Sequence, residues 1–85
     1  MPDITYAELF AFLSSLGFQE FSGSAFDAVW RHPASGAVVV FSLAAPHDAA
    51  RGADLLSAEI RLQHHGLLEG SLRGAIVAAR VHGET

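Results

Sequence analysis

Apolar residues recur at helical spacing near the start of the chain. They repeat every three or four residues, as on one face of a helix: Leu9, Phe12, Leu13 and Leu16. Thr5 and Glu8 have the spacing of a capping box, in which each side chain accepts a backbone N–H at the start of a helix. Gly17 suits the left-handed residue that commonly follows a helix. The pattern predicts a helix over residues 6–16.

In the next third of the chain, the residue types alternate with a period of two, as in a β-strand. Over residues 26–32, one side of the predicted strand has Phe26, Ala28 and Trp30, and the other has Asp27, Val29 and Arg31. The turn residues 33–36 lead to the apolar, β-branched segment 37–43, so the two segments predict a β-hairpin. Residues 18–21 are a weaker strand candidate.

Two segments with helical spacing complete the pattern. Asp54 is the expected N-cap of a helix that ends near residue 66. Its apolar residues form two stripes, one of Leu55, Ala58 and Leu62 and the other of Leu56 and Ile60. Residues 68–79 also have a helical period, which predicts a third helix, although the run AIVAARV is also compatible with a strand. We therefore predict a single α+β domain over residues 1–85: helix, three-stranded antiparallel sheet, helix, and an additional C-terminal helix or strand.

The amino-acid composition excludes several kinds of functional site. The 85 residues include no cysteine, which excludes disulfides, thiol catalysis and cysteine-ligated zinc. No apolar run approaches the roughly 18 residues of a membrane span, and the first residues lack the basic start of a signal peptide. We predict a cytoplasmic protein without membrane contact. A hydrophobic content of 51% is high for so small a domain, which indicates a dense core or apolar surface that a partner covers.

The charge balance bears on nucleic acids. The chain has five basic residues, all arginines and none clustered, against nine acidic residues, for a net charge of −4. Proteins that bind RNA tightly usually carry a basic stripe that displaces phosphate counterions. We therefore predict that any RNA binding is weak.

Five short segments follow one another in a fixed order along residues 6 to about 68. They are LGF after the first helix, GS before the middle strand, WRHPASG at the hairpin, VVVF in the next strand and DLLSAEIRLQHHGL at the second helix. In the order and spacing of these segments the chain resembles the HicA family of small bacterial toxins, whose fold is double-stranded-RNA-binding-like.

The resemblance implies a metal-independent ribonuclease that cleaves messenger RNA and is held inactive by a HicB antitoxin. In that family the catalytic histidine follows the Gly-Ser pair. Here Ala25 follows Gly23-Ser24, and an alignment anchored on His32 places Asp27 at that position. Neither alignment supplies the histidine, so this chain is similar to a divergent member of the family that lacks ribonuclease activity.

Other histidines are weak substitutes. Cleavage of RNA through its 2′-hydroxyl needs a proton acceptor, a proton donor and a group that meets the phosphate, and histidine serves best near neutral pH. His47 is the remaining catalytic candidate, with Arg51 to meet the phosphate, although a solvated loop residue explains His47 better. Consecutive histidines at 64 and 65 point about 100° apart on a helix, so they do not grip one metal ion together. We expect no metal and no cofactor.

Arg31, His32 and Arg51 are weak candidates for contact with nucleic acid. Pro33 pushes His32 toward an extended backbone, so a strand-end residue packed on its neighbours is the interpretation that we favour. Trp30 is likewise expected in the core rather than as a platform for bases.

Three classes of function remain open. They are an active messenger-RNA-cleaving toxin, an inactive relative that binds a protein or RNA, and a self-associating structural module. We favour the second. Both helices are expected on one face of the sheet, which leaves the other face open for a HicB-like antitoxin or a second copy of the chain. The spare apolar stripe of the predicted second helix is the alternative surface for such a partner. The predicted interface residues are Asp27, Val29, Arg31, Val39 and Phe41.

Overall fold

The computed structural model describes residues 3–21, 27–42 and 47–83 of the chain. In chain order the elements are α1 (Tyr6–Ser15), β1 (Gln19–Phe21), β2 (Asp27–His32), β3 (Ala37–Ser42), α2 (Gly52–His64) and α3 (Leu72–Gly83). The predicted α+β order of helix, three-stranded antiparallel sheet and helix is confirmed, and the additional C-terminal element is a helix. The predicted strand residues Phe26 and Leu43 lie outside the described residues, as do residues 44–46, which the sequence predicts as part of a loop.

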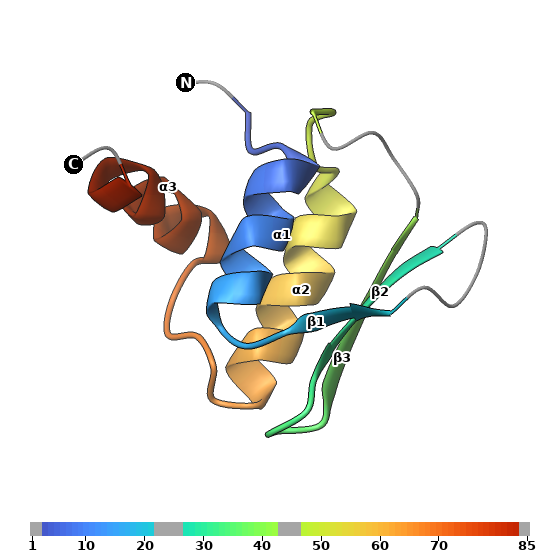
Figure 1. The fold of residues 1–85 in the computed structure, drawn as a ribbon. Helices are drawn as coiled ribbons and strands as arrows, with labels where there is room; N and C mark the ends of the chain where they lie inside the picture. The colour runs from blue at the N-terminus through green and yellow to red at the C-terminus, as the bar shows by residue number, and fades with distance from the viewer. Residues whose placement is uncertain (1–2, 22–26, 43–46, 84–85) are drawn as a thin grey trace.

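The three strands form one antiparallel sheet in the order β1-β2-β3. The hairpin register pairs Asp27 with Ser42 and His32 with Ala37, and β1 pairs with the second half of β2 through Gln19↔Arg31 and Phe21↔Val29. The helices lie on one side of this sheet, with α1 and α2 next to it and α3 beyond them (Figure 1). No helix formed by the described residues lies on the opposite face of the sheet (Figure 1).

The core fills the space between the sheet and the helices. Its buried apolar side chains come from the segment before α1, from Phe18 between α1 and β1, and from every element except β1. Four aromatic rings pack against one another at its centre, with centroids of neighbouring rings 5.1 to 6.5 Å apart, where α1 faces β2 and β3: Tyr6, Phe10, Trp30 and Phe41. Trp30 is therefore a core residue, as its alternation predicts.

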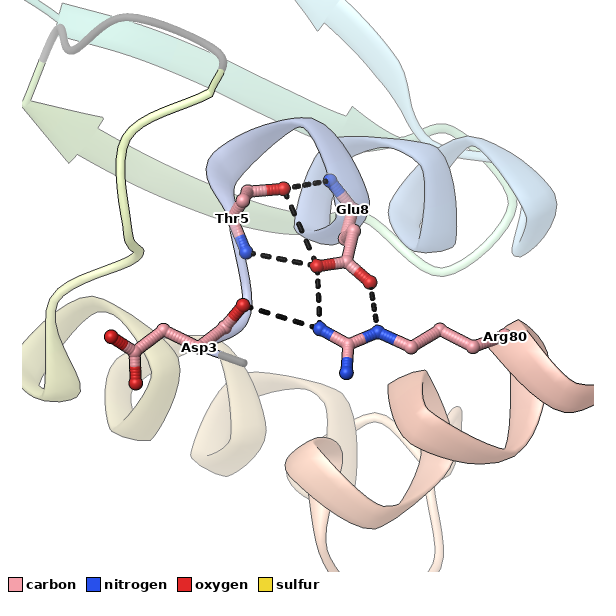
Figure 2. A network of polar contacts seen from close by, with 4 residues as sticks. All are labelled: Asp3, Thr5, Glu8 and Arg80. Carbon is pink, nitrogen blue, oxygen red and sulfur yellow. Dashed lines mark hydrogen bonds and ion pairs between the residues drawn. The ribbon is translucent and has the colours of Figure 1, made fainter. Parts of the chain in front are cut away.

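The capping box at the start of α1 also anchors α3. The Glu8 amide donates to Thr5 Oγ1 (3.2 Å), and the Thr5 amide donates to Glu8 Oε1 (3.1 Å), as the sequence predicts. Arg80 of α3 pairs with the same carboxylate and donates from Nη2 to the Asp3 carbonyl oxygen (3.2 Å) (Figure 2). The hydrogen bond from Arg80, supported by the Thr5 amide, lowers the pKa of Glu8 to about 2. One carboxylate thus joins the first and last helices.

The start of α2 differs from the prediction. The helix begins at Gly52 with Arg51 as N-cap, three residues before the expected start after Asp54. Asp54 instead lies in the first turn and accepts a hydrogen bond from the hydroxyl of Tyr6 (2.6 Å), while the same hydroxyl accepts one from the Arg51 amide (3.2 Å). Burial and the bond to Asp54 raise the pKa of Tyr6. A contact between residues 48 positions apart therefore sets where α2 begins.

None of the helices in the described part of the chain is both long enough and apolar enough to cross a membrane.

Candidate partner-binding surface

The open face of the sheet carries apolar side chains that nothing in the described structure covers. On β2, Ala28, Trp30 and His32 point toward the helices, so Val29 and Arg31 lie on the open face. On β3, Val38 and Val40 are 40% and 52% exposed. Val29 and Arg31 are where the sequence places them. Asp27 is the first residue of β2.

Two of the predicted interface residues are wrong. Val39 and Phe41 are 2% and 1% exposed and belong to the core. The reason is the register, which places Val39 opposite Trp30, and directly opposed residues of an antiparallel pair share a face. A four-residue turn over 33–36 closes the hairpin with His32 opposite Ala37, so counting outward from that turn would have placed Val39 with Trp30 in the core. Val38 and Val40 are the surface residues that the prediction missed.

Side chains of the open face line up in two rows across the strands. The register aligns Phe21, Val29 and Val40 in one row and Gln19, Arg31 and Val38 in the other. Phe21 is 49% exposed, and the Arg31 guanidinium lies 5.7 Å from the centre of its ring. This geometry is a cation–π contact that holds the arginine over the apolar row.

A shallow hollow lies between the two rows. It has a volume of about 250 Å³ and is lined by Phe21, Val29, Arg31 and Val38. We call the residues of the two rows, Gln19, Phe21, Val29, Arg31, Val38 and Val40, the open-face patch. An apolar centre edged by an arginine is typical of surfaces that bind proteins.

A second exposed apolar feature lies on α2. The predicted division into two stripes is confirmed, because Leu55, Ala58 and Leu62 are buried. Leu56 and Ile60 are each 56% exposed. These two residues lie on the helix surface turned away from the core, separate from the open-face patch.

His32 is a packing residue and not an exposed nucleic-acid contact. Its side chain is buried, and its ring lies 5.0 Å from that of Phe18. Nε2 lies 3.0 Å from the Leu16 carbonyl oxygen, which can only accept, so Nε2 carries the proton. Nδ1 then accepts from the Ser35 amide at 3.2 Å and from the Ser35 hydroxyl at 2.7 Å. The ring joins the end of α1 to the hairpin turn, which confirms the interpretation favoured from Pro33.

Gly17 makes room for this histidine. Its φ is +101°, a conformation that favours glycine, and a Cβ at this position would lie 3.3 Å from His32 Nε2. The LGF segment therefore has a structural function at the end of α1.

The remaining basic candidates lie apart from one another in the fold. Arg31 is on the open face of the sheet, whereas Arg51 caps α2 in the helical layer that covers the opposite face. Both are exposed. His47 is exposed in the turn before α2. Ala25, one of the two positions that align with the family histidine, lies outside the described residues. The described residues contain no group of three histidine, aspartate or glutamate side chains able to hold a metal ion.

Comparison of the chain with models of known protein families, with curated proteins and with solved structures finds no match.

Proposed function

We propose that the chain is a divergent HicA-like domain of toxin–antitoxin type that has no ribonuclease activity and acts by binding a protein partner through its open-face patch. The observation that carries this proposal is the row of Phe21, Val29 and Val40 on the sheet face that no helix of residues 3–21, 27–42 and 47–83 covers. Leaving such a row in water is unfavourable, and a protein surface of matching shape would cover it.

The chemistry of the described residues supports an inactive domain. His32 has both ring nitrogens engaged in hydrogen bonds within the fold. The open-face patch holds no histidine, so it offers no imidazole for acid–base catalysis of RNA cleavage. The resemblance to the HicA family makes a HicB-like antitoxin the partner of choice.

The net charge of −4 favours protein over RNA as the ligand. Arg31 is the only arginine of the open-face patch, and one phosphate contact supplies little affinity at physiological salt. We expect a dissociation constant for duplex RNA weaker than about 10 µM at that salt. A sub-micromolar dissociation constant would contradict this expectation and indicate that RNA is the ligand.

The direct test of inactivity is incubation of the purified protein with messenger RNA, together with expression in growing cells. Intact RNA and unchanged growth are the expected results. Cleavage that disappears in a His47→Ala variant would contradict the proposal and identify an active messenger-RNA-cleaving toxin.

The test of binding begins with the reading frames beside the gene, where the proposal predicts a HicB-like antitoxin, and continues with a calorimetric titration of that protein. Val29→Lys should weaken the complex at least tenfold, because the charge enters the centre of the apolar row. Ser14→Lys adds the same charge at an exposed position of α1 and should leave the affinity unchanged. Equal affinities for all three proteins would exclude the open-face patch as the binding surface.

A further inference from the structure

The two edges of the sheet differ in their protection against a further strand. β1 contributes only three residues, and two of them are the polar Gln19 and Glu20. β3 contributes six residues, AVVVFS, without a charge, proline or glycine, and it pairs with β2 at every position. Natural sheets shield exposed edges with short strands, charges, prolines or bulges. Within the described residues no strand pairs with the outer edge of β3, and its sequence carries none of these protections.

A groove lies between this edge and α2. It has a volume of about 270 Å³ and is lined by Val38, Val39, Val40, Ser57 and Arg61. The middle of β3 therefore lies beside the middle of α2. A two-fold axis through the groove would place β3 of one copy beside β3 of a second copy, and α2 beside the second α2.

We propose that a second copy of this chain occupies the edge, with the two β3 strands antiparallel, so that two three-stranded sheets join into one sheet of six strands. A two-fold axis requires this self-complementary, antiparallel contact. The unpaired N–H and C=O groups of one edge then meet their complements in the same edge of the other copy. Val38 and Val40 continue the open face across the junction, and Val39 continues the core.

Charges on α2 fit the same symmetry. Asp54 and Arg61 are seven residues apart, which is close to two helical turns, so they lie on one side of the helix. Two α2 helices that cross antiparallel near Ser57 bring Asp54 of each copy to Arg61 of the other. The Tyr6 hydroxyl is bound to Asp54 Oδ2, and Oδ1 is the atom that we assign to this contact.

The size of the contact sets the expected affinity. Six strand residues and thirteen helical residues each span about 20 Å, and the sheet and helix layers together are about 20 Å deep. The contact face of one copy therefore measures about 400 Å² in projection. Pairing two such faces would bury about 1,000 Å² of accessible surface in total, which is near the lower end for stable interfaces. We expect a dissociation constant in the micromolar range. Because the contact uses the sheet edge and the flank of α2, it stands independently of the proposed function.

Sedimentation equilibrium of the full chain between about 1 and 300 µM tests the dimer. The mass should rise from that of the 9.0 kDa monomer to twice that value. Ser57→Arg places a second arginine in the groove and should keep the protein monomeric, whereas Ser14→Arg on α1 should behave as the wild type. Both serines are exposed helical positions, so circular dichroism should show an unchanged fold.

Two outcomes would overturn this arrangement. One is a monomeric mass over the whole concentration range. The other is a dimer that Ser57→Arg leaves intact and Val29→Lys dissociates, since that result would place the interface on the open face and not at the edge.

A charge-swap experiment tests the pairing of β3 itself. Val40 is half exposed, so Val40→Lys and Val40→Glu should each fold and each weaken the dimer at least tenfold, because like charges face one another across the axis. An equal mixture of the two variants should recover a heterodimer. A mixture that associates no better than either variant alone would contradict strand pairing at this edge.

Discussion

The two faces of the sheet use the same residue types for different purposes. Val39 and Val40 are neighbours on β3, yet one is 2% exposed and the other 52%. The covered face meets the aromatic cluster and holds the helices in place. The side chains of the open face point away from the aromatic cluster and are partly exposed, so they contribute little to the stability of the fold. Apolar side chains without a packing function are the clearest indication of a binding surface in this chain.

The difference lies in the arrangement of the hairpin and not in the composition of the strand. β3 is apolar on both sides, so the sequence of that strand alone is equally compatible with either face being buried. The pairing of Val39 with Trp30 decides between them, because the large indole ring enters the core against Phe10. A residue on one strand thus determines the surface that the next strand presents.

Truncation of one phenylalanine on each face should give the largest difference in the free energy of unfolding between the two faces. Phe41→Ala removes a core side chain that is 1% exposed and should lower the free energy of unfolding by about 3–5 kcal/mol. Phe21→Ala removes a half-exposed ring and should change it by less than about 0.5 kcal/mol. Urea denaturation of both variants measures the difference. Comparable losses would mean that the two faces are equally important for stability.

Val39→Thr and Val40→Thr apply an almost isosteric change to the same two faces. The buried hydroxyl at position 39 should cost about 1–3 kcal/mol, because the core around it is apolar. The exposed hydroxyl at position 40 should cost less than about 0.5 kcal/mol. The midpoint of thermal unfolding under identical conditions checks both values, and a reversed order would contradict the assigned register.

Gly17→Ala tests the packing of His32 at the end of the covered face. The positive φ should cost about 1–2 kcal/mol, and the contact with the imidazole ring should add to it. Gly36→Ala is the matched control, because that residue also has a positive φ, at +78°, but a Cβ there would meet no atom within 4 Å. Equal losses for the two variants would show that the close approach to His32 is unimportant.

The Glu8–Arg80 pair gives the smallest expected effect, because both side chains are partly exposed. The pKa of Glu8 is lowered to about 2 from an ordinary value of 4.5, so its contribution is present above pH 4.5 and is lost as the pH falls toward 2. Glu8→Gln should therefore be less stable than the wild type at pH 7, with a difference that shrinks in acid. Thermal unfolding between pH 2 and 7 measures this, and a difference independent of pH would exclude the ionised pair as its cause.

Local patterns in the sequence were sufficient for most of the fold. Thr5 and Glu8 identify the start of α1 because a capping box depends only on residues three apart. The alternation around Trp30 identifies β2 and its buried side, and the spacing of Leu55, Ala58 and Leu62 identifies the inner stripe of α2. Each of these signals arises within one element.

Contacts between elements explain what the patterns left open or placed wrongly. Asp54 has the residue type of an N-cap, but Tyr6 binds it and the helix begins earlier. The C-terminal segment is compatible with helix or strand until Leu72 and Ile76 are buried and Arg80 reaches Glu8. The open-face patch was identified in part, because its β2 residues follow from alternation whereas Val38 and Val40 depend on strand register.

The central claim is that the open-face patch binds a protein partner. Its most direct test is capture on the tagged chain from the cells that produce it, carried out in parallel with the wild type, Val29→Lys and Ser14→Lys and quantified by mass spectrometry and absorbance at 260 nm. The claim predicts a protein that is retained in stoichiometric amount by the wild type and Ser14→Lys and lost from Val29→Lys, without nucleic acid. The same set of proteins on all three baits, or RNA in place of protein, would contradict it.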